Sequence, residues 1–139
     1  MGDVGYFDAS GRLWFCGRKA HRVVSREQTR FTLPCEGVFN AHPKVYRTAL
    51  VGVARNGDTE AVLCVELEAG ARGESTQTLS SELRGLGAAC AHTRGIDRFL
   101  FHPAFPVDVR HNAKIFREKL AVWAAGKLAA EQPVPGKPR

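Results

Sequence analysis

Long hydrophobic runs are absent from this sequence of 139 residues. No apolar stretch approaches the roughly 20 residues that a membrane-spanning helix needs. The opening residues, Met1-Gly2-Asp3, also lack the basic and apolar blocks of a secretion signal. We therefore expect a cytoplasmic protein without a membrane span.

Cysteine is scarce and scattered. The four cysteines, Cys16, Cys35, Cys64 and Cys90, form no C-x-x-C pair, and no histidine stands at zinc-ligand spacing from them. Three of them, at positions 16, 64 and 90, are flanked by apolar residues, which is typical of small buried side chains in a reducing compartment. The pattern argues against disulfides and predicts no metal site.

Acidic residues are fewer than basic ones. Twenty Lys and Arg residues against 14 Asp and Glu residues give a net charge of +6. An acidic partner is one interpretation of this excess, and a solvated surface is the other, since the basic residues are scattered. At this length we expect one domain, which is small for an enzyme that must enclose a large substrate. The proline-rich residues 131–139 predict a disordered tail.

Turn residues and hydrophobic periodicity predict a small α+β domain. The Asn56-Gly57 pair lies between two segments rich in β-forming residues, 48–53 and 61–67, which should pair antiparallel. A Ser/Thr-rich stretch from Ser75 should cap a helix whose leucines recur at i, i+4 and i+7. The other expected elements are a hairpin over 5–16, a polar loop over 25–32, a helix of about two turns from Pro34 to Pro43, a strand over 98–102 and a helix over 114–130. The expected fold is a three-stranded sheet covered by helices and preceded by a β-hairpin.

The predicted hairpin over residues 5–16 is rich in aromatic residues. An isolated two-stranded hairpin is marginally stable in water, so its aromatic side chains need a surface to pack against. Either they pack on the rest of this domain or they pack on something that this chain does not contain.

A cluster of positive charge surrounds the predicted start of the last helix. Asn112 is a good N-cap residue, so Lys114 should lie in the first helical turn, where the helix dipole disfavours a cation by about 0.3–1 kcal/mol. Arg110 and His111 add to the cluster. A bound phosphate or carboxylate, contacted by residues 110–112 and 114, would explain it. The alternative is that Lys114 points its ammonium group into water.

A second basic run, over residues 18–22, contains four basic side chains. It is either a contact to a phosphate or ribose group or a solvated connector between two elements.

Five motifs stand in order along the chain. They are Gly2-Asp3-Val4-Gly5-Tyr6 with Gly11-Arg12-Leu13, Gly17-Arg18-Lys19, Ala41-His42-Pro43, Ala49-Leu50-Val51-Gly52-Val53, and Pro106 with Ala113-Lys114-Ile115. In order and approximate spacing they resemble the C-terminal end of the adenylate-forming (AMP-binding) superfamily, which contains acyl-CoA synthetases, luciferases and nonribosomal-peptide adenylation domains. Within it, residues 2–7, 12–18 and 110–115 are most similar to the beta-lactone synthetase family of bacterial long-chain olefin biosynthesis.

This resemblance implies roles for individual residues. Asp3 matches an aspartate that accepts hydrogen bonds from the ribose hydroxyls of ATP, and Arg18 matches an arginine that also reaches the ribose. Lys19, Ala20 and His21 match the hinge between two domains. Lys114 matches a lysine that lies between the substrate carboxylate and the α-phosphate of Mg-bound ATP, where a fixed ammonium group stabilises the transition state of adenylation.

The resemblance also divides the chain. Residues 1–17 match the last hairpin of a large N-terminal domain, 18–22 the hinge, 23–130 a mobile C-terminal lid, and 131–139 a tail. The glycine-rich phosphate loop of the family belongs to the large domain and does not occur here. The chain is therefore expected to be inactive alone, with the missing adenylation domain as its partner and with ATP as a cofactor of the whole enzyme only.

The sequence departs from the family pattern in three places. Ala20 and His21 stand where acidic or lysine residues are common, Ala113 replaces a glycine, and Ser25-Arg26-Glu27-Gln28-Thr29 lacks the glycine that lines the tunnel for coenzyme A or a carrier arm. The last departure leaves the use of coenzyme A open. It favours an intramolecular second step, namely β-lactone closure of a long-chain β-hydroxy acid.

Two alternatives remain open at the level of sequence. One is the lid of a fatty-acyl-CoA synthetase. The other is a stand-alone basic module that binds nucleic acid through Arg18, Lys19, Arg22, Arg26 and Arg30. The sequence contains no recognisable nucleic-acid-binding motif, so we expect no nucleic-acid partner.

Overall fold

The structure is a computed structural model that describes residues 3–131, without the side chains of residues 111–113 and 131. Its elements are β1 (Asp3–Phe7), β2 (Leu13–Arg18), the 3₁₀ turn η1 (Lys19–His21), β3 (Val23–Val24), β4 (Thr29–Arg30), α1 (Thr32–Asn40), β5 (Val45–Arg55), β6 (Asp58–Leu67), η2 (Ala69–Ala71), α2 (Thr76–Ala88), β7 (Phe99–Phe101), β8 (Val107–Asp108), β9 (His111–Ile115) and α3 (Arg117–Glu131). The predicted tail over 132–139 lies outside the described residues. In the described part of the chain, no helix is long and apolar enough to cross a membrane.

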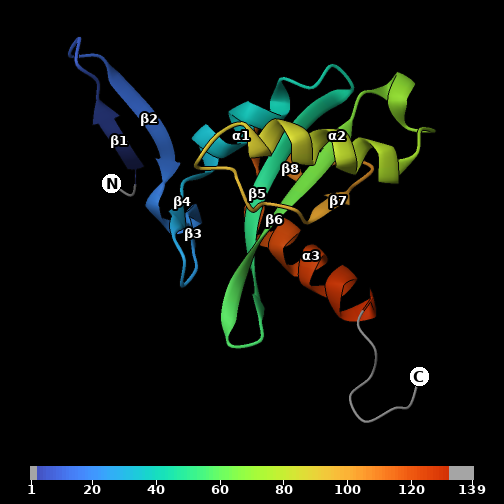
Figure 1. Cartoon of the computed structure of the whole chain (residues 1–139). Helices are drawn as coiled ribbons and strands as arrows, with labels where there is room; N and C mark the ends of the chain where they lie inside the picture. The colour runs from blue at the N-terminus through green and yellow to red at the C-terminus, as the bar shows by residue number, and fades with distance from the viewer. Residues whose placement is uncertain (1–2, 132–139) are drawn as a thin grey trace.

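The centre of the fold is the sheet formed by β5, β6 and β7 (Figure 1). β5 and β6 pair antiparallel from Val45 opposite Leu67 to Arg55 opposite Asp58. Asn56 and Gly57 close this hairpin with φ angles of 52° and 78°, as a two-residue turn with positive φ at both positions requires. β7 then pairs parallel with β6. The predicted α+β class and the antiparallel pairing are confirmed.

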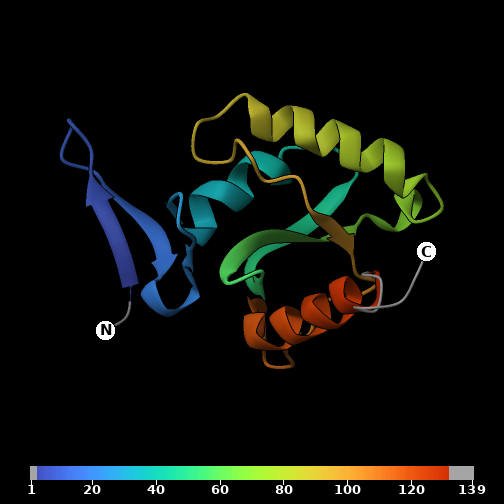
Figure 2. The ribbon, with the colours of Figure 1, turned by 60° about the horizontal axis from the view of Figure 1, so that its bottom comes forward.

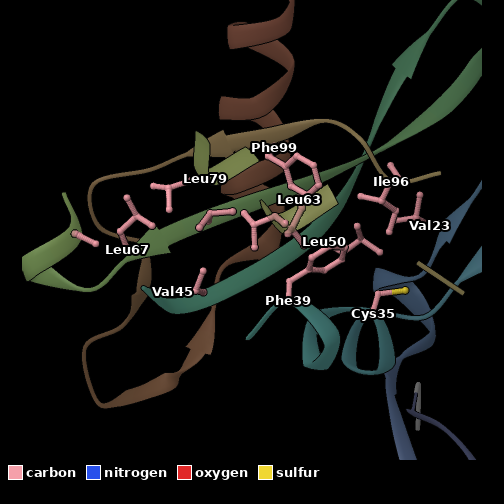
Figure 3. Close-up of a cluster of buried hydrophobic side chains, with 14 residues drawn as sticks. Val23, Cys35, Phe39, Val45, Leu50, Leu63, Leu67, Leu79, Ile96 and Phe99 are labelled. Atoms are coloured by element: carbon pink, nitrogen blue, oxygen red, sulfur yellow. The ribbon is translucent and has the colours of Figure 1, made fainter. Parts of the chain in front are cut away.

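Helices cover both faces of this sheet. Figure 2 shows α1 and α2 on one side of β5 and β6, and α3 on the other. Because successive strand residues point to opposite faces, Leu50 and Leu63 pack towards α1 and α2 while Val51 and Val62 pack towards α3. The first cluster is drawn in Figure 3, where Phe39 of α1 lies near Leu50 and Leu63.

The helices begin and end for local reasons. Ser75 caps α2 by accepting a hydrogen bond from the backbone N–H of Thr78 at 3.3 Å, as predicted. On the inner face of α2, Leu79 and Leu83 are buried and Leu86 is partly buried. α1 begins at Thr32, two residues before the predicted start at Pro34.

His42, from one of the five motifs, joins α1 to α2. It is buried just after α1, and its Nε2 lies 2.7 Å from a carboxylate oxygen of Glu82 on α2. Its Nδ1 accepts a hydrogen bond from the backbone N–H of Lys44. This motif residue therefore has a structural role in packing.

Two predictions about strands and helices were wrong. The last helix begins at Arg117, and Lys114 lies on the strand β9 instead of in a first helical turn. β9 pairs with β8, with Val107 opposite Ile115, so this segment satisfies its backbone groups by strand pairing and Asn112 does not cap the helix. The polar loop predicted over 25–32 likewise contains β4, which pairs with β3.

The hairpin of β1 and β2 projects away from the sheet (Figure 1). Its large apolar side chains are between 47% and 71% exposed; they are Tyr6, Phe7, Leu13, Trp14 and Phe15. Of the two alternatives raised by the sequence, this exposure favours packing on something that the chain does not contain. Because successive strand residues point to opposite faces, Phe7, Leu13 and Phe15 share one face of the hairpin, which we call the apolar hairpin face.

All four cysteines are free thiols. Those at 16, 35 and 64 are buried, and Cys90 is half-buried, so the prediction of structural thiols is confirmed for the first three.

Candidate functional site

An open pocket of about 660 Å³ lies where β2, the 3₁₀ turn η1, the start of α1 and the junction of β9 with α3 meet. Its walls are formed by Phe15, Gly17, Arg18, His21, Thr32, Leu33, Lys114, Ile115, Phe116, Arg117 and Glu118. Three of the site residues predicted from the sequence, Arg18, His21 and Lys114, thus line one space. We call it the lysine pocket.

Asp3 is not among the described residues that line the lysine pocket, but the register of the hairpin places it directly opposite Arg18, which is. Directly opposed residues of an antiparallel pair project to the same face of the ribbon. Both residues are exposed, so the carboxylate of Asp3 and the guanidinium of Arg18 are available to a ligand on that face.

Lys114 is exposed at the wall of the pocket. Two backbone contacts position the segment that carries it. Ile115 pairs with Val107, and the N–H of Phe116 donates to the carbonyl of Pro106 at 2.9 Å. These contacts hold the strand just before α3 begins. The ammonium group therefore stands on a paired strand that runs into a packed helix.

The hinge predicted over Lys19, Ala20 and His21 forms the 3₁₀ turn η1. Lys19 and Ala20 are exposed, whereas the side chain of His21 is 23% exposed. Its Nε2 lies 2.8 Å from Oε2 of Glu118 in the first turn of α3. The pKa of Glu118 lies below its ordinary value, chiefly because its carboxylate accepts a hydrogen bond from its own backbone N–H and further because of His21.

A buried ion pair that the sequence did not predict includes one residue of the pocket wall, Arg117. Arg117, the first residue of α3, directs both terminal nitrogens to the carboxylate of Glu36 on α1, with Nη2 donating to Oε1 at 2.9 Å. Glu36 also accepts the N–H of Leu50 at 2.8 Å. A signal was present, because a glutamate near the middle of a short helix with apolar neighbours needs a partner when it is buried.

The remaining predicted contacts are not brought to the pocket. Arg110 lies near the tip of the hairpin of β8 and β9, its side chain is 83% exposed, and its guanidinium stands 3.8 Å from a carboxylate oxygen of Asp108. Among the described residues that line the lysine pocket, Arg110 does not occur. The side chains of His111 and Asn112 lie outside what the structure describes.

In the described ranges, no group of three or more His, Cys, Asp or Glu residues could hold a metal ion. Burial raises the pKa of Cys35 to about 11 and that of Cys64 to about 12, so both remain protonated thiols at neutral pH.

Two curated relatives match nearly the whole chain. The olefin beta-lactone synthetase of Xanthomonas campestris pv. campestris is 59% identical over 125 residues, which is 90% of this chain and 22% of that protein. The olefin beta-lactone synthetase of Stenotrophomonas maltophilia is 57% identical over 129 residues, which is 92% of this chain and 23% of that protein. The chain thus spans less than a quarter of the length of these relatives. No family model matches it.

Solved structures share the fold. An amide bond synthetase from Marinactinospora thermotolerans is 25% identical with a TM-score of 0.73, and the match covers 88% of this chain and 24% of that one. A structure of ATP-bound MatB from Rhodopseudomonas palustris is 17% identical with a TM-score of 0.72, over 89% of this chain and 24% of that one. The second likeness concerns the fold alone.

Proposed function

This chain belongs to the adenylate-forming enzymes as a C-terminal domain, and from that premise we propose that it is the lid of an ATP-dependent ligase that activates a carboxylate as an acyl adenylate. One observation carries the proposal. Lys114 and Arg18, far apart in the sequence, line the same pocket, and Asp3 is the cross-strand partner of Arg18.

In the proposed first step, a carboxylate oxygen of the acid attacks the α-phosphorus of ATP and pyrophosphate leaves with the electron pair of the broken P–O bond. Negative charge grows on the phosphoryl oxygens, and the ammonium group of Lys114 stabilises that charge more than the charge of the ground state. Asp3 accepts hydrogen bonds from the ribose hydroxyls, and Arg18 contacts the same ribose. Magnesium arrives with ATP, and we assign no residue of this chain to it.

We further propose the division of the chain that the resemblance implies. The hairpin up to residue 17 completes a large N-terminal domain, residues 18–22 form the hinge, and residues 23–130 form the lid that rotates about it. The exposed apolar hairpin face and the small share of the relatives that the chain spans support this division. On this proposal the chain is inactive without the large domain.

For the second step we propose β-lactone closure. The β-hydroxyl oxygen of a long-chain β-hydroxy acyl adenylate attacks the acyl carbon, the bond from that carbon to the AMP oxygen breaks, and AMP leaves while the hydroxyl proton passes to solvent. The names of the two relatives support this choice, as does the absence of glycine between Ser25 and Thr29. Transfer to coenzyme A is the alternative product.

We do not propose the nucleic-acid-binding module. Arg22, Arg26 and Arg30 direct their guanidinium groups to backbone carbonyls of the chain itself. The expectation of a cytoplasmic enzyme stays part of the proposal, because free thiols suit a reducing compartment.

The test is a chimera in which this chain replaces the matching residues of the Xanthomonas campestris enzyme, joined to the rest of that enzyme. With ATP and a long-chain β-hydroxy acid, we expect mass spectrometry to find a β-lactone and AMP without coenzyme A. An acyl-CoA formed only with coenzyme A would support the alternative product. A Lys114→Ala chimera should lose at least about 100-fold in acyl-adenylate formation, and unchanged adenylation would refute the role of Lys114.

A further inference from the structure

The buried ion pair of Glu36 and Arg117 holds the start of α3, the helix that follows the strand of Lys114. We propose that these two are positioning residues, which hold Lys114 in the geometry that adenylation needs. The inference rests on the proposed function of Lys114, and neither residue is required to touch the substrate.

The connection from Arg117 to Lys114 is short. The two residues are three positions apart, which is at most about 11 Å of extended chain. The intervening Phe116 is held by the carbonyl of Pro106, and Ile115 by pairing with Val107. Because only Ile115 and Phe116 separate the two residues and no loop intervenes, we expect a displacement of Arg117 to shift Lys114.

The anchor at the other end is firm. Only 6% of the side chain of Glu36 and 13% of that of Arg117 are exposed. The carboxylate of Glu36 takes two hydrogen bonds from Arg117 and a third from the N–H of Leu50 on β5. The start of α3 is thus tied to both α1 and β5, across 81 residues of sequence. A planar guanidinium on a carboxylate fixes orientation as well as distance.

The pair also sets the charge of the pocket. Arg117 is itself part of the pocket wall. Because Glu36 neutralises it through two hydrogen bonds, Arg117 does not compete with Lys114 for a phosphate group. The other side-chain contact at this helix start, between His21 and Glu118, is a weaker anchor, because 73% of the Glu118 side chain is exposed.

The experiment measures both half-reactions of the chimera in the variants Arg117→Lys and Glu36→Gln. We expect single-turnover acyl-adenylate formation to slow by about 10- to 100-fold, as small misplacements of a catalytic group do. The apparent KM for ATP should change little. Consumption of a presynthesised β-hydroxy acyl adenylate should stay within about two-fold of the parent, because Lys114 acts only in the first step. All assays run at a temperature where circular dichroism shows each variant folded.

The matched control is Glu60→Gln. Glu60 also accepts hydrogen bonds from arginines, namely Arg55 at 2.6 Å and Arg98 at 3.3 Å. It lies near the beginning of β6 and is not among the residues of the lysine pocket. Removing its charge tests the loss of an arginine-bound carboxylate in the same domain. We expect both half-reactions to stay within about two-fold of the parent.

A double-mutant cycle separates positioning from general damage. In a Lys114→Ala background, Arg117→Lys and Glu36→Gln should cause no further loss of adenylation. If Lys114→Ala lowers adenylation by about 100-fold or more while the two variants slow both half-reactions equally, or slow neither, the positioning role is wrong and the proposed function stands. If Lys114→Ala leaves adenylation unchanged, the proposed function itself fails.

Discussion

The imidazole Nε2 of His21 lies 2.8 Å from the carboxylate Oε2 of Glu118, so a side chain of the predicted hinge contacts the first turn of the helix that follows Lys114. This contact links the 3₁₀ turn η1 to the wall of the lysine pocket. It also gives His21 a definite partner.

Removing this contact should have a small effect on adenylation. Because Glu118 is largely exposed, the pair contributes about 0.2–1 kcal/mol. In the chimera, we expect His21→Ala to slow acyl-adenylate formation by less than about five-fold, and 0.5 M NaCl to reduce the difference by screening. Glu118→Gln should slow acyl-adenylate formation to the same extent. The double variant should be no slower than either single variant. A loss above 100-fold for His21→Ala alone would point to direct catalysis by the imidazole.

Gly17 cannot be replaced by a residue with a side chain. Its φ is +115°, and a Cβ there would lie 2.4 Å from Oγ1 of Thr32. We expect Gly17→Ala to lower the free energy of unfolding by about 1–3 kcal/mol. The control is Gly126→Ala on the exposed side of α3, where a Cβ meets nothing within 4 Å and the helix should gain about 0.5–1 kcal/mol. Urea denaturation of the isolated chain measures the free energy of unfolding of both variants. Equal denaturation midpoints for the two variants would contradict the prediction.

The apolar hairpin face should promote self-association of the isolated chain. Phe7 and Leu13 are direct partners across the hairpin and are 71% and 65% exposed. We expect the double variant Phe7→Lys and Leu13→Lys to lower both ANS fluorescence and the apparent mass in light scattering. Val122→Lys is the control, because Val122 is 75% exposed on α3, away from the hairpin.

The same double variant should have the opposite effect in the chimera. If the large domain covers the apolar hairpin face, two lysines there are buried without partners and should lower the melting temperature. Val122→Lys should leave it within about 1 °C. An unchanged melting temperature for the double variant would indicate that the large domain does not cover this face.

The buried thiols should destabilise the fold at high pH. The pKa of Cys64 is raised by burial from 9.0 to about 12, so between these values the folded chain holds a proton that the unfolded chain releases. Stability is therefore complete below pH 9 and falls as pH rises towards 12. We expect Cys64→Ala to have a shallower decline than the parent in urea denaturation between pH 8.5 and 10.5.

Thiol reactivity gives a second check on the cysteines. At pH 8, Cys35 and Cys64 should resist Ellman's reagent in the folded chain and react in 6 M urea, because only the thiolate is reactive and burial suppresses it. Half-buried Cys90 should react first. A Cys90→Ala variant that keeps the fast phase would contradict this assignment.

Local signals account for the elements that were predicted correctly. Asn56 and Gly57 tolerate positive φ, and this fixed both the turn and the register of β5 with β6. Ser75 and the leucine spacing identified α2, because capping and helical periodicity act over a few residues. The five motifs identified the family before any contact was known.

Competition between distant segments explains the errors. The residues around Lys114 are compatible with a first helical turn, yet this segment pairs with β8 and forms a strand instead. Propensity is a weak preference that such tertiary pairing overrides. For the same reason, local sequence predicts a loop over residues 25–32, where the structure pairs β4 with β3.

The amino-acid sequence alone determines the family, the order of the main elements and the identity of Asp3, Arg18 and Lys114 as candidates, because these depend on local residue types and spacing. The meeting of Arg18 with Lys114 in one pocket, and the pairing of Glu36 with Arg117 across 81 residues, depend on packing of α1, β5 and α3 around the sheet. A carboxylate needs a hydrogen-bonded cation as partner only when folding buries it, so the identity of that partner depends on the tertiary structure.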